Sequence, residues 1–207
     1  MKKTLFLAAS LCWAVAAFAA DANGPMKVWS YDNLKDVRIS VDKGNKASLR
    51  LSPDVKTPDG KDTLEVSLEE FSPDAVSWSI QLRFVYDGGL KAGHGYEVSF
   101  LCKGSEPGTI QTVMALENSP WTGLPGSDST IEVSRDWQMV KLSFTVKKDC
   151  DEPLAIPRFM PANYGNPATL HFGPATLRDL SQKQTVVESG NLIFNSSFEI
   201  GTRVTTS

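Results

Sequence analysis

The chain has 207 residues and a formal net charge of −3; 41% of its residues are hydrophobic and 22% are charged. This length suits one globular domain, with or without a fragment of another. The composition supports a sizeable core and excludes a disordered or fibrous chain. Because acidic residues outnumber basic ones, the charge also argues against a nucleic acid partner.

Residues 1–19 have the features of an export signal. Two lysines precede an apolar stretch over residues 4–15, and Ala17-Phe18-Ala19 forms a small-x-small cleavage site. We expect cleavage after Ala19, because cleavage one residue later would place Phe18 where the processing site needs a small residue. The alternative is a retained anchor, although the stretch is short for a membrane span. The chain is therefore expected to be secreted, or to reach the periplasm or cell surface, without a membrane span.

Beyond the signal, apolar residues recur with a period of two, which predicts strands and argues against long helices. Three alternating runs open the domain, each typical of a strand with one solvated face. They cover residues 37–41, 47–51 and 64–68.

The run from Trp78 to Phe84 predicts a central strand. Alternation places Trp78, Ile80 and Leu82 on the core side with Phe84. Gln81 and Arg83 share the opposite, polar face with Ser79.

More alternating runs follow, separated by turn clusters rich in Gly, Pro, Asn and Asp. Roughly ten short strands in one chain predict an all-β fold, a two-sheet antiparallel β-sandwich of jelly-roll type. The later runs cover residues 96–102, 109–116, 130–134, 137–146, 154–160 and 169–172, with Leu177 near the end.

We expect the sandwich to occupy residues 20–182, followed by a polar linker at 183–190. Residues 191–207 begin a new apolar run with nothing in this chain to pack against. They predict the start of a second module and hence further domains in the same chain. The alternative is a terminal strand added to the sandwich edge.

Export would leave Cys102 and Cys150 in a compartment where disulfides persist. Each closes a strand-like run, so they either pair at neighbouring strand ends or stay as two unpaired small apolar residues. Together with the scattered His94 and His171, they do not make a structural zinc site.

Two segments resemble motifs of a known family. They are Leu90-Lys-Ala-Gly-His-Gly-Tyr96-Glu-Val-Ser-Phe100 and Val133-Ser-Arg-Asp-Trp137-Gln-Met-Val-Lys-Leu-Ser-Phe144-Thr. They resemble carbohydrate-binding modules of the cellulase-C type, families 4, 9, 16 and 22, which have a galactose-binding-like jelly roll. The resemblance spans roughly residues 28–180. The segment from Asn191 to Glu199 resembles the opening strand of another such module.

The resemblance has two gaps that bear on metal binding. The first domain lacks the family's opening Asn-x-x-x-Asn-x-x-Phe-Glu strand, and Phe172-Gly173-Pro174 replaces the usual Asp of the closing strand. Those acidic positions commonly help to hold a structural calcium ion. We therefore expect recognition without a metal or other cofactor, and the resemblance gives little support for calcium.

Sugars are recognised by aromatic rings that stack on their flat apolar faces and by polar side chains that bond their hydroxyls. Trp121 is the leading candidate, since it lies in a loop flanked by Pro120 and Gly123 where the resembling modules commonly carry a stacking aromatic. The alternative is that its indole caps the sandwich. Gln81 and Arg83 either line a concave cleft or belong to an ordinary solvated face.

Four further residues are weaker candidates for sugar contacts. Glu117 and Arg158 are expected near the same end of the sandwich as Trp121, and Asn163 and Tyr164 lie in a turn. No pair of carboxylates stands out for glycoside hydrolysis, and the Gly-x-Ser-x-Gly and His-Glu-x-x-His motifs are absent.

The sequence thus predicts a secreted, non-catalytic module that binds a polysaccharide or oligosaccharide, as the N-terminal part of a multidomain glycoside hydrolase. One alternative is a structural or adhesion spacer of a cell-surface protein. The other is a polysaccharide lyase that uses Arg158, Asn163, Tyr164 and His171.

Overall fold

The computed structural model describes residues 24–32, 34–164 and 167–181 of the chain. The expected export signal, linker and second module lie outside these described residues. None of the helices among the described residues is long and apolar enough to cross a bilayer.

Seven strands form the larger sheet, and each pairing within it is antiparallel. Its order is β1-β12-β6-β11-β4-β3, and β9 also pairs with β6. The strands are β1 (Lys27–Trp29), β3 (Lys46–Lys56), β4 (Asp62–Glu70), β6 (Gly95–Gly104), β9 (Gln138–Thr145), β11 (Ala168–Phe172) and β12 (Ala175–Asp179).

Five strands form the smaller sheet, which is also antiparallel and has the order β2-β5-β10-β7-β8. Its strands are β2 (Val37–Val41), β5 (Ile80–Tyr86), β7 (Gly108–Leu116), β8 (Ser129–Val133) and β10 (Leu154–Met160). Two short 3₁₀ helices, η1 (Ser77–Ser79) and η2 (Pro161–Tyr164), precede β5 and follow β10.

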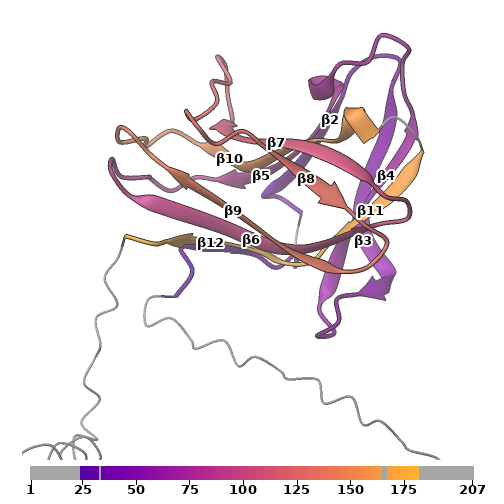
Figure 1. Ribbon diagram of the computed structural model, residues 1–207, viewed down its shortest axis with the longest axis horizontal. Helices are drawn as coiled ribbons and strands as arrows, with labels where there is room; N and C mark the ends of the chain where they lie inside the picture. The colour runs from indigo at the N-terminus through magenta and orange to yellow at the C-terminus, as the bar shows by residue number, and fades with distance from the viewer. Residues whose placement is uncertain (1–23, 33, 165–166, 182–207) are drawn as a thin grey trace, which may run out of the picture. The chain divides into compact units, whose positions relative to one another are not determined.

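The two sheets lie face to face, as Figure 1 shows with β5, β7 and β10 in one layer and β6, β9 and β12 in the other. The predicted all-β, two-sheet antiparallel β-sandwich of jelly-roll type is confirmed. Every predicted run contains a strand, and the one at 37–41 matches β2 to the residue. In the run from Trp78 to Phe84 the strand begins only at Ile80. The three-residue strand β1 was not predicted, because so short a run carries no periodic signal.

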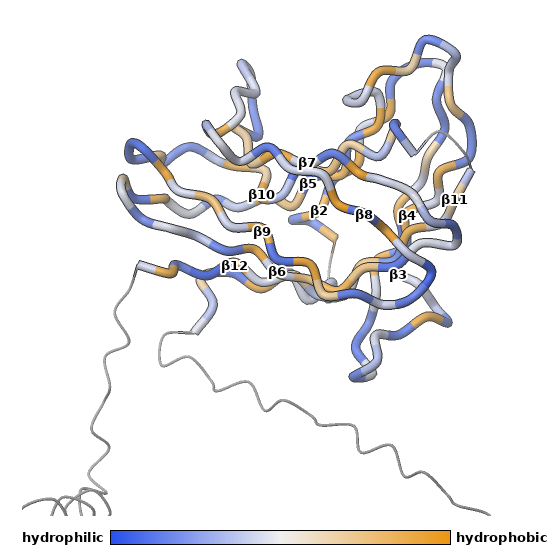
Figure 2. Tube along the Cα trace, in the orientation of Figure 1, coloured by the Kyte–Doolittle hydropathy of each residue, from blue (hydrophilic) through white to orange (hydrophobic). Residues whose placement is uncertain are grey.

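Four phenylalanines make the centre of the core, two from each sheet. The ring of Phe159 lies 5.5 Å from that of Phe84, 5.2 Å from that of Phe100 and 5.0 Å from that of Phe172, measured between centroids. All four are almost completely buried. Figure 2 shows the hydrophobic and hydrophilic residues alternating along the strands of both layers, as a sheet with one buried face requires.

Cys102 and Cys150 are both free thiols, so the predicted option of a disulfide is wrong for this fold. Antiparallel pairing places Cys102 opposite Gln138, the first residue of β9. Cys150 lies beyond Thr145, the last residue of that strand. The length of β9 separates them by roughly 20 Å, far beyond the reach of a disulfide. Cys102 is part of the core, and burial raises the pKa of its thiol to about 11.

His171 and Arg158 lie on opposite outer faces of the sandwich. His171 sits between the core residues Leu170 and Phe172 in β11, so alternation turns it away from the core on the larger sheet. Arg158 precedes the core residue Phe159 in the smaller sheet. The four residues of the lyase hypothesis therefore do not gather into one catalytic site.

Replacing Phe159 with alanine should lower the free energy of unfolding by about 3 to 5 kcal/mol, because it removes the ring that contacts the other three phenylalanines. Urea unfolding measures this change. Met139→Ala is the matched control. The Met139 side chain is exposed, so this substitution should lower the free energy of unfolding by less than about 0.5 kcal/mol. Equal losses for the two variants would contradict the assignment of the core.

His171 should make stability fall as the pH is lowered. It is buried, and desolvation lowers its pKa below the usual value despite the opposing effect of Glu65. The unfolded chain therefore takes up a proton at this position before the folded chain does, and stability is lost as the pH falls through the unfolded pKa, about 6.5. Urea unfolding at pH 7.5 and 5.0 should show a larger loss for the wild type than for His171→Gln. An equal loss in both proteins would contradict this.

Candidate functional site

A cleft of about 400 Å³ opens on the outer face of the smaller sheet; we call it the sheet cleft. In β5, Ile80, Leu82 and Phe84 face the core, so Gln81 and Arg83 face outward. Outward-facing side chains of the central strands therefore form the middle of the cleft. The residues that line it are Ser40, Trp78, Gln81, Arg83, Trp121, Arg158 and Met160.

Two exposed tryptophans belong to this cleft. Trp78 is 59% exposed and Trp121 is 56% exposed, which is unusual for the largest apolar side chain. By contrast, Trp29 is buried, with its indole N–H donating to the Val85 carbonyl, and Trp137 is half-buried beneath Lys103. The sheet cleft therefore offers two accessible aromatic faces.

Trp78 faces solvent, although the alternation over residues 78–84 predicts a core position for it. The helix η1 interrupts the two-residue alternation before β5 begins at Ile80, so Ser79 is buried and Trp78 faces solvent. The Ser79 hydroxyl accepts the Val76 N–H, and the Gln81 amide donates to the Trp78 carbonyl at 3.0 Å. These bonds hold the turn that carries the indole.

Trp121 stands in a short hairpin that extends β7. The Leu116 N–H bonds the Thr122 carbonyl at 3.0 Å, and Ala115 pairs with Gly123. Between them Trp121 adopts a φ of +55°, and its N–H donates to the Asn118 carbonyl. A left-handed backbone costs a bulky residue about 1 kcal/mol, and such strain concentrates at binding sites.

Three arginines lie side by side across β2, β5 and β10. Arg38 pairs in register with Arg83, and Arg83 pairs in register with Arg158. We call Arg38, Arg83 and Arg158 the arginine row. Like charges directly opposite one another on neighbouring strands repel each other, so this row needs a compensating charge.

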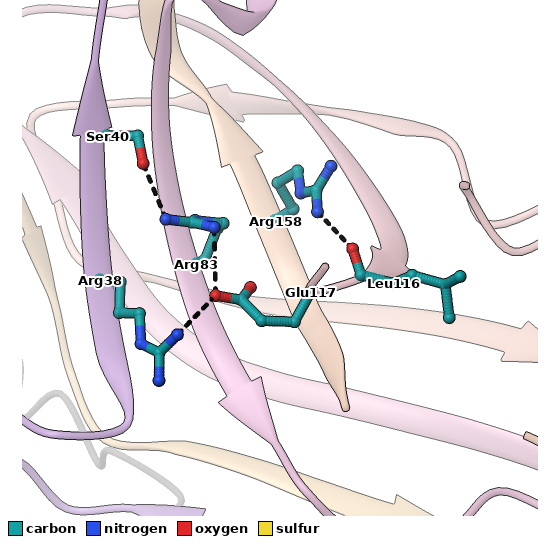
Figure 3. Close-up of polar contacts among 6 residues, drawn as sticks. All are labelled: Arg38, Ser40, Arg83, Leu116, Glu117 and Arg158. Carbon is teal, nitrogen blue, oxygen red and sulfur yellow. Dashed lines mark hydrogen bonds and ion pairs between the residues drawn. The ribbon is translucent and has the colours of Figure 1, made fainter. Parts of the chain in front are cut away.

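Glu117 supplies part of that compensation. Its Oε1 accepts from the Nη1 atoms of Arg38 and Arg83, each at 3.1 Å, and its side chain is 3% exposed (Figure 3). Arg83 also donates to the Ser40 hydroxyl at 2.7 Å. Glu117 thus holds Arg38 and Arg83 in place and neutralises one of them.

Arg158 has a different environment. Its Nη2 donates to the Leu116 carbonyl at 2.6 Å, a neutral partner (Figure 3). The residue is 6% exposed, and its pKa is lowered by burial first and by the neighbouring Arg83 second. An arginine still keeps its proton under these conditions, so the cleft contains a buried positive charge.

The structure thus brings together Trp121, Gln81, Arg83, Glu117 and Arg158 among the predicted candidates. Tyr164 lies elsewhere, because its buried ring packs against Gly104 and Gly108 and its hydroxyl donates to the Glu106 carbonyl. Asn163 is exposed in η2 and does not line the cleft.

A larger hollow of about 610 Å³ lies beside residues 122–125 and 145–152. No aromatic side chain lines it, and its charged side chains come from one loop that carries both signs of charge. The sheet cleft is therefore the better candidate for sugar recognition. Among the residues that the structure describes, no cluster of three or more His, Cys, Asp or Glu side chains has the geometry to hold a metal ion.

No protein-family model and no curated protein sequence matches the chain. Solved structures do share its fold. A structure described as "CBM4 structure and function" is 23% identical with a TM-score of 0.52, and the match covers 77% of this chain and 97% of that one.

Two further structures extend the comparison. The N-terminal cellulose-binding domain of β-1,4-glucanase C from Cellulomonas fimi is 14% identical with a TM-score of 0.51, covering 77% of this chain and 99% of that one. The CBM22-1 xylan-binding domain of Xyn10C from Paenibacillus barcinonensis is 12% identical with a TM-score of 0.54, covering 78% and 98%. The resemblance found in the sequence is confirmed at the level of the fold.

Replacing Trp121 with asparagine should change the free energy of unfolding by less than about 1 kcal/mol. The side chain is half exposed, and asparagine tolerates the left-handed backbone. Urea unfolding makes the measurement, and Trp29→Ala, which removes a buried indole, should lose about 3 kcal/mol or more as a control. A loss for Trp121→Asn close to that of the control would show that Trp121 caps the sandwich.

Proposed function

We propose that the sandwich domain is a non-catalytic module that binds a polysaccharide or oligosaccharide in the sheet cleft. The observation that carries this proposal is the pair of exposed tryptophans, Trp78 and Trp121, beside a floor of polar side chains. A sugar ring has an apolar face that stacks on an indole and a rim of hydroxyls that need donors and acceptors. Gln81, Arg83 and Ser40 provide such groups within the same cleft.

The fold supports this proposal without deciding it, since one fold hosts many functions and the site must carry the argument. Two structures of the same fold are described as cellulose-binding and xylan-binding domains. The cleft-lining residues include no carboxylate, so the pair that glycoside hydrolysis needs is not present among them. Binding is therefore the function that the geometry supports best.

The spacer hypothesis predicts a convex, charged sheet face without aromatic groups. The outer face of the smaller sheet instead carries a cleft with two accessible indoles. Holding Trp121 at a positive φ also costs free energy, and such strain is typical of binding sites and not of a spacer. These observations favour ligand binding over a purely structural role.

We also propose that the protein is exported through residues 1–19 and acts outside the cytoplasm. A module of this kind would hold a further domain of the same chain, such as a glycoside hydrolase, close to its polysaccharide. The apolar run at 191–207 supports a further module. The modules to which this chain is similar include an N-terminal domain of a glucanase.

Replacing Trp78 or Trp121 with alanine should weaken glycan binding about tenfold or more each, equivalent to about 1.4 kcal/mol, because each removes one stacking face. Affinity electrophoresis of the full chain against soluble β-glucans, xylans, mannans and pectins makes the measurement. Trp137→Ala is the matched control, since it removes an indole that precedes β9 in the other sheet.

The proposal is supported if one glycan retards the wild type and the Trp137→Ala control but does not retard either cleft variant. Failure of every glycan to retard the wild type would favour the spacer. A fall in polymer viscosity would show that the domain is catalytic.

A further inference from the structure

At the sheet cleft, arginines outnumber the carboxylates that are bonded to them. Arg83 and Arg158 line the cleft, and Arg38 lies beside Arg83 in the arginine row. Glu117 is the one carboxylate bonded to these arginines among the described residues. The whole chain has a net charge of −3, so this local excess opposes the overall sign. The excess is therefore a property of the site and not of the composition.

Glu117 forms its ion pairs on one side of the row, and its buried Oε2 has no hydrogen-bond partner among the described residues. Its Oε1 accepts from both Arg38 and Arg83, and Figure 3 shows Arg158 directed to the Leu116 carbonyl instead. Arg158 therefore has a neighbouring cation across the strand pair and a neutral hydrogen-bond acceptor on its own side, and Glu117 acts on it through its charge without a hydrogen bond. Its charge has no carboxylate bonded to it within the described part of the chain.

Burying such a group is costly. An ionised side chain taken out of water loses several kcal/mol of solvation unless an opposite charge compensates, and like charges on facing strand positions add to the loss. Arg158 is 94% buried, and the Nε atoms of Arg158 and Arg83 have no hydrogen-bond partner among the described residues. A hydrophobic residue would fit the position better if its only role were structural.

Both guanidinium groups line the cleft, so a ligand can reach the site where they lie. Guanidinium groups recognise oxyanions through paired, charge-assisted hydrogen bonds, which are stronger than bonds to neutral hydroxyls. Trp78 and Trp121 line the same cleft, whose volume is about 400 Å³. The residues thus combine a surface for a ring with a partner for an anion.

We infer that the sheet cleft selects a sugar unit that carries an anionic group, with Arg158 and Arg83 as its partners. This inference rests on the proposed function and narrows its ligand class from carbohydrates in general to acidic ones. The shared chemistry is an oxyanion on a sugar ring, either the carboxylate of a uronate or a sulfate ester. The indoles hold the ring and the arginines distinguish acidic from neutral sugars.

The test compares glycans that differ only in charge, measured with the full chain by titration calorimetry. Polygalacturonate against its methyl ester and glucuronoxylan against its carboxyl-reduced form examine the carboxylate. Dextran sulfate against dextran examines the sulfate. We expect at least tenfold tighter binding to the acidic member of one pair, with the preference disappearing as salt is raised, because screening weakens ion pairs.

Two variants test whether the preference for acidic glycans depends on the arginine row. Arg158→Gln should reduce the ratio of acidic to neutral affinity to within about twofold, whereas Arg135→Gln, the same charge change at an exposed residue paired with Glu106, should leave the ratio unchanged. Thermal unfolding checks that each variant is folded. If Arg158→Gln does not fold, Arg83→Gln and the salt titration of the wild type make the same comparison.

The outcomes separate the two proposals. Preference for one acidic member, lost in Arg158→Gln, supports the inference and names the anionic group. Equal affinity for both members of every pair, or preference for the neutral member, overturns the inference and leaves the carbohydrate-binding proposal standing. Failure to bind any member of any pair, together with failure against the neutral panel, overturns both.

Discussion

Contact between the two sheets through Phe84, Phe159, Phe100 and Phe172 is the constraint on which the rest of the structure depends. Successive side chains of a strand face opposite sides, so each phenylalanine that enters the core turns its neighbour outward. Arg83 precedes Phe84 and Arg158 precedes Phe159. Packing the hydrophobic layer therefore places the two arginines on the same outer face.

The site follows from strand order as much as from side-chain identity. β2, β5 and β10 are distant in sequence and adjacent in the sheet, and their register brings Arg38, Arg83 and Arg158 into one row. The hairpin after β7 adds Glu117 and Trp121 at the same place, and η1 adds Trp78. A sandwich scaffold thus holds two arginines and two exposed indoles in one cleft.

Some side-chain positions follow from local alternation, whereas others depend on the tertiary structure. Gln81 and Arg83 were placed on a polar face because strand alternation is local and survives folding. Trp78 fits the alternation of a core position in the sequence. The 3₁₀ turn that moves it to the surface is only three residues long and leaves no recognisable sequence pattern. The wrong disulfide option has another cause. Cys102 in β6 lies opposite the start of β9 and Cys150 lies beyond its end because of the register between the two strands, which adjacent sequence does not encode.

The sequence by itself determined the all-β class, the positions of most strands, and the polar and apolar faces of each one. It did so because the period of two is a property of the chain alone. The tertiary structure decided which polar faces meet, that Trp78 joins Trp121, and that one carboxylate is bonded to two of three arginines. These features depend on strand order and register, which are set by long-range packing between residues that the sequence keeps far apart.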